Sequence, residues 1–351
     1  PFRSGMKADT LGDPDPATWD AHYRGTIHAV VLVGDQLQAP HDAALAKVRG
    51  LIGTGITVLG QENGRGRHNA NGDGIEHFGY VDGRSQPLFL KEDIREETLG
   101  ADGTSTWNPR FAPNRAIVPD PAAPDPAHDF GSYFVFRKLE QNVRRFKQEE
   151  ARLATRLGLA GKSAALAGAM LVGRFEDGSP LASQSGKGAK NPVQNDFDYD
   201  SDVGDGTPAT DGGGGKCPHF AHIRKMNPRG SGGFESHDVE RTHIMARRGQ
   251  TYGIRTDNPN DGLLTNKPVK DVGLLFMAFN ANIEEQFQFV QRVWANNPGF
   301  PRMAPGRTAP GLDLVIGQGP RPNIDCPVKW GADFKKAGDH KITAAVPQTV
   351  K

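Results

Sequence analysis

Short apolar runs that alternate with helical segments most limit how this chain can fold. The strand-like runs are rich in β-branched and aromatic residues, as buried strands are. They are Ile27–Val33, Ile56–Leu59, Tyr133–Leu139, His243–Ala246 and Leu274–Phe279. Apolar residues at helical spacing occupy 41–52, 141–157, 163–172 and 283–296. This order of elements predicts an α+β fold with helices packed on a sheet.

Glycine and proline shape the connections between these elements. They account for 44 and 26 of the 351 residues, and both interrupt regular structure. We therefore expect long ordered loops, above all over 60–130 and 176–217. No apolar run approaches the length of about 18 residues that crosses a bilayer, so no membrane span is expected.

Charge and cysteine content narrow the partners. The chain has 42 basic and 41 acidic residues, a net charge of +1, which gives no general attraction to nucleic acid. Cys217 and Cys326 are too few for a disulfide framework. The chain begins at Pro1 without a signal peptide. We expect a soluble protein, secreted or cytoplasmic, whose targeting region lies outside this sequence, and the sequence sets neither compartment nor oligomer.

Two short segments hold polar residues at the ends of apolar runs. In FGYVDGRSQP, residues 78–87, Asp82 precedes a glycine, which is usually a turn. The alternative is a carboxylate held at a tight bend as an acid–base group. Arg247 and Arg248 follow the run His243–Ala246, where paired arginines are usually solvated. A buried arginine there would instead stabilise negative charge in a site.

A third segment concentrates potential metal ligands. Cys217, His219 and His222 lie within six residues, and cysteine and histidine are the ligands of zinc. A zinc hydrolase is therefore one interpretation, although no distant pair of ligands completes a closed site. A single imidazole can also hold a haem iron and leave its other face open.

Together and in this order, the segments resemble the dye-decolorizing peroxidase family, over about residues 1–330. The resemblance is closest to the longer-chain branch that includes secreted fungal enzymes. The matching motifs are Gly79-x-x-Asp82-Gly83, Ala221–Lys225, Arg247-Arg248-Gly249 with Tyr252-Gly253, Leu274–Phe276 with the helix after it, and Gly311–Asp313 through Gly317-Gln318.

The resemblance implies two ferredoxin-like subdomains around one haem b. Residues 1–130 would form the N-terminal half with the Asp82 loop, and 131–351 the C-terminal half with the histidine and arginine. The family's first half normally begins upstream with a strand-rich segment. We therefore expect this half to be incomplete, either through processing or because another chain completes it.

The resemblance also implies roles for single residues. His222 would be the proximal iron ligand, with His219 as the rival. Asp82 and Arg247 would form the distal pair. Asp313 would hydrogen-bond the proximal imidazole, with Glu284 as the alternative. Further haem contacts are expected from Arg224, Leu274 and Phe276.

The implied activity is reduction of hydrogen peroxide coupled to one-electron oxidation of dyes, phenols or other aromatic donors. Asp82 would act as acid and base, and Arg247 would stabilise cleavage of the O–O bond. Tyr252 and Trp294 are candidate surface radical sites for bulky donors. The main alternative is a haem-binding or haem-handling protein without peroxidase turnover, and the second is the zinc hydrolase.

Overall fold

The computed structural model describes two compact units. The larger unit comprises Pro1–Asp13 and Gly64–Val350, and the smaller unit comprises Pro14–Asn63. The described residues are 2–9, 11–98, 107–182, 195–199, 217–259, 261–302, 309–319, 324–327, 337–338, 340–342 and 349–350. Neither unit ends at residue 130, so the expected boundary there stays a prediction.

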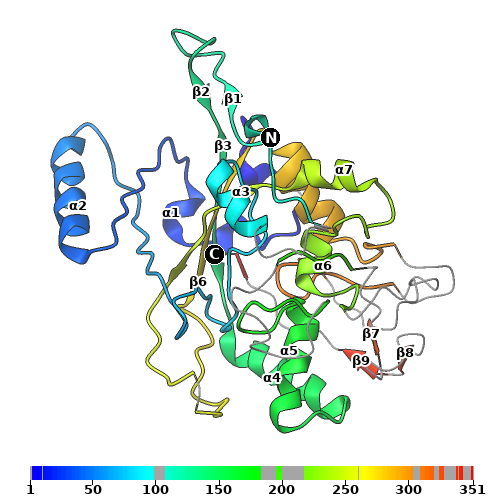
Figure 1. Ribbon diagram of the computed structural model, residues 1–351. Coiled ribbons are helices and arrows are strands. Elements are labelled where there is room, and N and C mark those ends of the chain that lie inside the picture. The colour runs from blue at the N-terminus through cyan, green and yellow to red at the C-terminus, as the bar shows by residue number, and fades with distance from the viewer. Residues whose placement is uncertain are drawn as a thin grey trace. The chain divides into compact units, whose positions relative to one another are not determined.

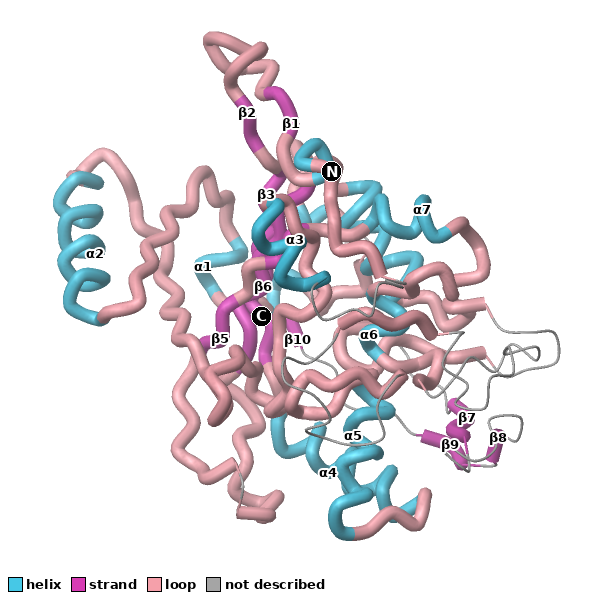
Figure 2. Tube along the Cα trace, viewed as in Figure 1, coloured by secondary structure: helices cyan, strands magenta, loops and turns pink. Residues whose placement is uncertain are grey.

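A five-stranded antiparallel sheet is the framework of the larger unit (Figures 1 and 2). Its long strands β3 (Tyr133–Glu140) and β6 (Gly273–Asn280) pair along their whole length. The other edge of β6 carries β4 (Ala246–Arg247) and β5 (Gln250–Tyr252), and β10 (Thr349–Val350) pairs with β3. The strands predicted over 133–139 and 274–279 are confirmed.

The strand predicted over His243–Ala246 is largely wrong. Arg241–His243 form a 3-10 turn, and β4 begins only at Ala246. The His243 ring stacks on Phe289 with ring centroids 3.7 Å apart, and its Nδ1 contacts the carbonyl oxygen of Glu285. These contacts hold His243 against the helical segment 284–295 and outside the strand ladder.

Helices α4 (Val143–Arg156) and α5 (Ala165–Val172) carry the main hydrophobic core. The side chain of Asn142 caps α4 by accepting a hydrogen bond from the backbone N–H of Arg145 at 3.0 Å. Phe146, Leu153 and Met170 are among the residues that meet in this core. Both helices confirm the helical spacing read over 141–157 and 163–172.

The predicted helix over 283–296 is helical but is wound as a π-helix. It consists of Glu284–Gln288 and Val290–Ala295, with bonds such as Gln288 N–H to Ile283 O at 2.9 Å. A π-helix is wider than an α-helix and is frequently found at functional sites. Phe287, Val290 and Gln291 of this segment line the cavity described below.

The remaining elements are short. The helices are α3 (Lys91–Thr98), α6 (His222–Met226) and α7 (His237–Glu240), with 3-10 turns at Met6–Ala8, Pro16–Thr18, Pro113–Arg115 and Gly161–Ala164. Strands β1 (Val118–Pro119) and β2 (Phe130–Gly131) form a two-stranded sheet. A separate three-stranded sheet consists of β7 (Ile324–Pro327), β8 (Ala337–Gly338) and β9 (His340–Ile342). None of the helices described is both long and apolar enough to span a membrane.

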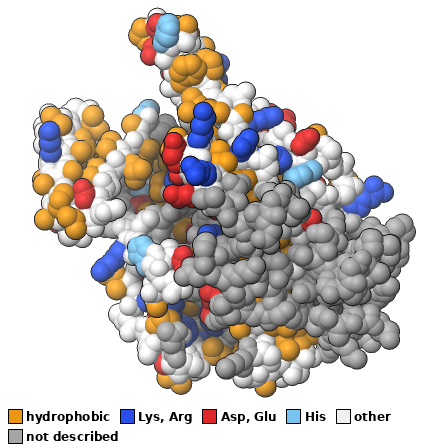
Figure 3. Space-filling view, viewed as in Figure 1, with side chains coloured by type: hydrophobic (Ala, Val, Ile, Leu, Met, Phe, Trp, Pro, Cys, Tyr) orange, Lys and Arg blue, Asp and Glu red, His pale blue; other side chains and the backbone are white. Residues whose placement is uncertain are grey.

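The smaller unit contains α1 (Ala21–Arg24) and α2 (Gln38–Ile52). Helix α2 confirms the helix predicted over 41–52, but the strands predicted over 27–33 and 56–59 are wrong, because neither segment is assigned as a strand. A strand needs a backbone partner, and no described residue pairs with either segment. Their apolar side chains are exposed, and Figure 3 shows hydrophobic side chains gathered on this unit.

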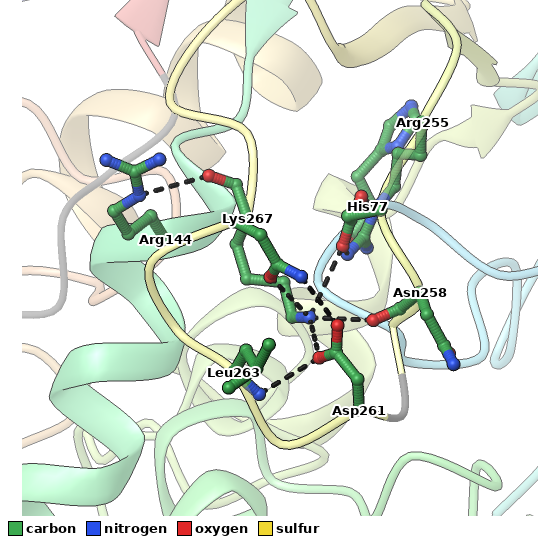
Figure 4. Close-up of polar contacts among 9 residues, drawn as sticks. His77, Arg144, Arg255, Asn258, Asp261, Leu263 and Lys267 are labelled. Carbon is green, nitrogen blue, oxygen red and sulfur yellow. Dashed lines mark hydrogen bonds and ion pairs between the residues drawn. The ribbon is translucent and has the colours of Figure 1, made fainter.

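The loop between β5 and β6 is anchored by an ionic network around the buried Lys267 (Figure 4). The Lys267 ammonium is 2.6 Å from Asp261 and 3.4 Å from Asp257, and it donates to the carbonyl of Asn258 at 2.7 Å. Arg255 pairs with Asp257 and donates to the carbonyl of His77 at 2.7 Å. The network therefore ties this loop to the segment around His77, which precedes the Asp82 turn.

Replacing Lys267 should destabilise the larger unit. Lys267→Met removes the cation of Asp261 and leaves Asp257 with Arg255 alone, and we expect the free energy of unfolding to fall by about 2 kcal/mol, as for the loss of hydrogen bonds to charged groups. Urea denaturation followed by circular dichroism measures this change. Lys270→Met is the matched control, because Lys270 is exposed and lies 3.8 Å from the exposed Asp271. That variant should change stability by less than about 0.5 kcal/mol, and an equal loss in both variants would contradict the anchoring role.

Candidate functional site

A cavity of about 560 Å³ lies in the larger unit and collects most of the site residues expected from the sequence. Its apolar wall includes Phe78, Tyr80, Leu139, Leu274, Phe276, Phe287 and Val290. Its polar lining includes Arg67, Glu76, Asp82, Arg84, Arg137, Arg174, His222 and Arg247. An apolar hollow with a few convergent charged groups is the usual form of a small-molecule or cofactor site.

His222 enters the cavity from the first turn of α6. Its Nδ1 lies 3.0 Å from Oδ2 and 3.2 Å from Oδ1 of Asp313, which is fully buried. A carboxylate at Nδ1 keeps that nitrogen protonated and leaves Nε2 with its lone pair. No described residue hydrogen-bonds Nε2, so this nitrogen is free to bind a metal ion. Glu284, the alternative partner, is exposed and makes no hydrogen bond or ion pair with His222.

Asp313 is held in its ionised form although it is buried. Burial opposes ionisation, but the interactions with His222 and with two backbone N–H groups outweigh it and lower the pKa of the carboxyl group. The backbone N–H groups of Val315 and Ile316 add hydrogen bonds to Oδ1 at 2.9 and 2.6 Å. The segment 313–316 thus fixes the carboxylate that orients the imidazole.

Asp82 and Arg247 line the same cavity, and the loop that follows Asp82 forms hydrogen bonds with Arg247. Gly79 and Gly83, with φ of 102° and 81°, make the tight turns on either side of Asp82. The backbone N–H of Arg247 donates to Oε1 of Gln86 at 3.1 Å, and its Nη2 donates to the carbonyl of Arg84 at 3.2 Å. Burial lowers the pKa of the Arg247 guanidinium, and the charge of Asp82 opposes this effect.

Ser85 fixes the loop 82–86 although its φ is 59°, in the left-handed region. Its hydroxyl donates to Oδ1 of Asn195 at 3.0 Å and accepts from Nη2 of Arg174 at 3.0 Å and of Arg229 at 2.9 Å. Burial lowers the pKa of Arg174 to about 10 and of Arg229 to about 9. Both guanidinium groups therefore stay charged at neutral pH behind the loop that carries Asp82.

The sheet supplies one wall of the cavity. Leu274 and Phe276 on β6 stand opposite Leu139 and Arg137 on β3, and all four line the cavity. Arg137 pairs with Asp13, and its Nη1 donates to Gln291 at 3.3 Å. Among the described residues, no acceptor meets the buried Nε of Arg137.

Arg67, elsewhere in the cavity lining, also has a buried Nε atom without an acceptor among the described residues. A guanidinium N–H that is buried without a partner costs free energy. Arg67 and Arg137 both line the cavity, and their positive charge suits an anionic group of a ligand.

Glu76 is a buried carboxyl group in the cavity lining. Its oxygens accept hydrogen bonds from the backbone N–H groups of Phe78 at 2.6 Å and Tyr80 at 2.9 Å, and from the side chain of Gln141. Burial outweighs these bonds and raises the pKa of Glu76 to about 7, and the charge of Asp82 adds to the increase. Glu76 therefore changes its protonation near neutral pH.

Asp313 lies outside the cavity lining, and so do three further residues predicted from the sequence. Arg224 is buried and donates to the carbonyl of Cys217 at 2.7 Å, with its guanidinium 5.0 Å from the Tyr199 ring centroid. Trp294 and Tyr252 are only 1% and 7% exposed, so their expected place on the surface is wrong. Trp294 stacks on Phe300, and the backbone carbonyl of Tyr252 contacts His77.

The zinc interpretation is not supported. Among the described residues, no group of three histidine, cysteine, aspartate or glutamate side chains is placed to hold a metal ion. Cys217 is buried, and burial raises the pKa of its thiol to about 12, which disfavours the thiolate that zinc requires. His219 is also buried and does not line the cavity.

Several cavity residues were missed from the sequence. Glu76 and Tyr80 lie a few positions before Asp82, where an alternating pattern could have placed them on one face with Phe78. Arg137 lies in a run that was read only as a strand. Arg174, which lines the cavity, and Arg229, which lies behind the Ser85 loop, carry no local signal, because their role depends on Asn195 and Ser85, which are distant in sequence.

Known proteins resemble this chain over nearly its full length, although no protein-family model matches it. The multifunctional dye peroxidase DyP2 of Amycolatopsis sp. is 54% identical over 352 residues, which cover 99% of this chain and 73% of that enzyme. The dye-decolorizing peroxidase of Mycena epipterygia is 32% identical over 335 residues, which cover 90% of this chain and 60% of that enzyme.

Solved structures agree with these relatives. The structure of DyP2 from Amycolatopsis sp. matches with a TM-score of 0.91 over 99% of this chain and 74% of that chain, at 54% identity. The DyP-type peroxidase of Anabaena sp. matches with a TM-score of 0.84 over 99% of this chain and 71% of that one, at 35% identity. The α+β fold predicted from the sequence is confirmed.

The raised pKa of Glu76 predicts how stability depends on pH. A carboxyl group with a folded pKa of about 7 and an ordinary value of 4.5 stabilises the fold below pH 4.5. This contribution is lost as the pH rises through 7, and it amounts to at most about 3 kcal/mol. Glu76→Gln keeps the group neutral, so its free energy of unfolding should lose less than wild type over this range.

Urea denaturation between pH 4.5 and 8 measures the effect. The control is Glu92→Gln, because Glu92 is exposed on α3. A wild-type pH dependence that persists unchanged in Glu76→Gln would contradict the assignment.

Proposed function

Because the chain belongs to the dye-decolorizing peroxidase family, we propose that it reduces hydrogen peroxide at a haem b held in the cavity. The electrons come from dyes, phenols or other aromatic donors, one at a time. The observation that carries the proposal is the hydrogen bond of Asp313 to Nδ1 of His222, on the same cavity as Asp82 and Arg247. That arrangement offers the basic Nε2 of His222 to iron. It offers peroxide an acid–base group, Asp82, and a fixed positive charge, Arg247.

The residues of the cavity fit a haem group. Its mostly apolar wall suits a flat macrocycle, and its volume of about 560 Å³ is of the size of a cofactor site. Arg67 and Arg137 line the cavity, and their positive charge suits a ligand that carries carboxylates. His222 would ligate the iron, and Leu274 and Phe276 would contact the ring. When bound, the haem supplies the iron that binds peroxide and the oxidising equivalents that donors consume.

The remaining steps use side chains of this chain. Asp82 takes the proton from one peroxide oxygen and returns it to the other as the O–O bond breaks, first as base and then as acid. Arg247 stabilises the negative charge that develops on the departing oxygen. The hydrogen bonds of Arg247 to Arg84 and Gln86 tie strand β4, which carries Arg247, to the loop that carries Asp82. Arg224, buried behind His222, supports α6 through Cys217.

Access to the cavity separates small oxidants from large donors. Leu274 and Phe276 would line the distal face of the bound haem and restrict access there to small oxidants such as hydrogen peroxide. Bulky dyes then require oxidisable side chains in the protein, the role expected for Tyr252 and Trp294. Both rings are buried, so that role would be an internal one.

The ligand assignment predicts the behaviour of two histidine variants. His222→Ala removes the nitrogen that binds the iron, and purified protein should retain little haem. His219→Ala is the control and should retain haem as the wild type does, because His219 does not line the cavity. The ratio of Soret to protein absorbance after purification measures retention. Full haem in His222→Ala together with loss in His219→Ala would reverse the assignment.

The distal pair predicts two distinct effects on the reaction with peroxide. Asp82→Asn removes the acid–base group and should slow this step by about 10²–10⁴-fold. Arg247→Leu removes a fixed charge and should slow it by about 10²–10³-fold. Because the ranges overlap, the pH dependence distinguishes the roles: the acid limb should flatten in Asp82→Asn and persist in Arg247→Leu.

Stopped-flow spectroscopy from about pH 3 to 8 measures the peroxide step. Both variants must first be shown to retain haem, so that a slow step reflects the side chain alone. A wild-type rate and acid limb in Asp82→Asn would leave Asp82 as a turn residue that only shapes the cavity.

A further inference from the structure

A short hairpin places two carboxyl groups of the cavity lining on the same face. The backbone N–H of Asp82 donates to the carbonyl of Gly74 at 3.0 Å, and the N–H of Glu76 donates to the carbonyl of Tyr80 at 3.1 Å. Gly74 therefore stands opposite Asp82, and Glu76 stands opposite Tyr80. Because side chains along a strand alternate between its two faces, Glu76 and Asp82 point to one face of the hairpin. Both residues line the cavity.

The residue opposite Asp82 has no side chain, and this makes Glu76 the neighbour of Asp82 on that face. A Cβ atom at Gly74 would meet nothing within 4 Å, so the space beside Asp82 is open. Diagonal neighbours in an antiparallel pair lie about 7–8 Å apart, within reach of long side chains. The carboxyl group of Glu76 can therefore exchange a proton with that of Asp82, directly or through one water molecule.

Three hydrogen bonds hold the Glu76 carboxyl group and still leave it a place for a proton. Oε2 accepts from the backbone N–H of Phe78 at 2.6 Å and from the side chain of Gln141. Among the described residues, Oε1 accepts only from the N–H of Tyr80, at 2.9 Å. Each carboxyl oxygen has two lone-pair positions. Oε1 can therefore take up a proton without the loss of any of these bonds.

The groups around Glu76 connect its protonation to that of Asp82. Burial is the main reason that the pKa of Glu76 rises to about 7, and the charge of Asp82 raises it further. From the other elements, the neutral Gln141 and the cationic Arg67 interact with Glu76. Tyr80 stays neutral, because burial and nearby carboxylates raise its pKa well above the ordinary value. Below pH 7, Glu76 thus holds a proton on the face that it shares with Asp82.

The reaction of the proposed function needs protons after the O–O bond has broken. The first oxygen of hydrogen peroxide leaves as water with both peroxide protons, one of which Asp82 carries. The second oxygen stays in the cavity and leaves as water only after it gains two electrons and two protons. The donors supply the electrons. A donor that carries no proton leaves the supply of both protons to the protein.

We propose that Glu76 supplies protons to the second oxygen through Asp82. This inference rests on the proposed function, which provides the oxidised centre and its electron donors. As each electron arrives, the O–H bond of Glu76 breaks and its proton passes to the Asp82 carboxylate, which releases it to the second oxygen. Water that enters the cavity then restores the proton of Glu76. The sequence occurs twice for each peroxide molecule.

Rapid-mixing kinetics with a donor that carries no proton test the proposal. Ferrocyanide gives up one electron at a time, so the protons must come from the protein or from solvent. After oxidation by hydrogen peroxide, the wild type should return to its resting state more slowly as the pH rises through about 7. In Glu76→Gln this return should be about 10²-fold slower than in wild type below pH 7 and should lose the pH dependence.

Two controls accompany this measurement. The oxidation by hydrogen peroxide should keep its wild-type rate in Glu76→Gln, because Asp82 alone carries the proton of that step. Asp73→Asn is the matched variant, since Asp73 is an acidic residue next to Gly74 that lies outside the cavity lining and accepts a hydrogen bond from Asn69 at 3.1 Å. Both steps should keep their wild-type rates in this variant.

Infrared titration of the purified protein supplies a readout that does not depend on turnover. The C=O band of protonated Glu76 should disappear with a midpoint near pH 7, and Glu76→Gln should lack this band. Asp82→Asn removes a negative charge from the same face, so it should move the midpoint of Glu76 to lower pH. A residue that only braces the hairpin turn would show neither this shift nor an effect on the pH dependence of the return step.

The outcomes separate the two proposals. A return step with the wild-type rate and pH dependence in Glu76→Gln overturns the role of Glu76 and leaves the peroxidase proposal intact, as does a Glu76 midpoint that stays in place in Asp82→Asn. Should Glu76→Gln fail to fold, the pH dependence of wild type and the midpoint in Asp82→Asn decide. Failure of wild type to bind haem or to react with peroxide overturns both proposals.

Discussion

The pairing of β3 with β6 is the interaction on which the cavity depends. Their antiparallel register sets Leu139 opposite Leu274 and Arg137 opposite Phe276, and these side chains share one wall. The far edge of β6 receives β4, whose Arg247 stands opposite Ala278. A slip of one residue would turn each of these side chains to the other face of the sheet. The sheet therefore determines both the shape of the wall and the place of the arginine.

Around this sheet, each functional group is held by a partner from a distant segment. His222 depends on Asp313, which is fixed by the backbone that follows it. The Asp82 loop depends on Ser85 and on two buried arginines. Most of these restraints are hydrogen bonds to charged groups, which are stronger than neutral ones. The charged groups of the cavity are therefore positioned before any ligand binds.

Sequence reasoning succeeded where the signal is local. Asp82, Arg247 and His222 each lie within a short motif, and all three line one cavity. It failed where the structure depends on distant partners. Ile27–Val33 has the composition of a strand, yet no described segment pairs with it. Glu76 and Tyr80 are held by hydrogen bonds to Gln141 and Glu150, which reach them from other elements. A single sequence does not reveal such pairs.

The π-helical winding of 284–295 has a consequence for how this segment tolerates change. A π turn is equivalent to an α-helix that has accommodated one additional residue. Deleting a single residue there would let the segment relax to regular α-helical winding, and the residues on one side would turn by about 100°. Phe287, Val290 and Gln291 would then leave the cavity wall. The length of this segment is thus as constrained as the identity of its side chains.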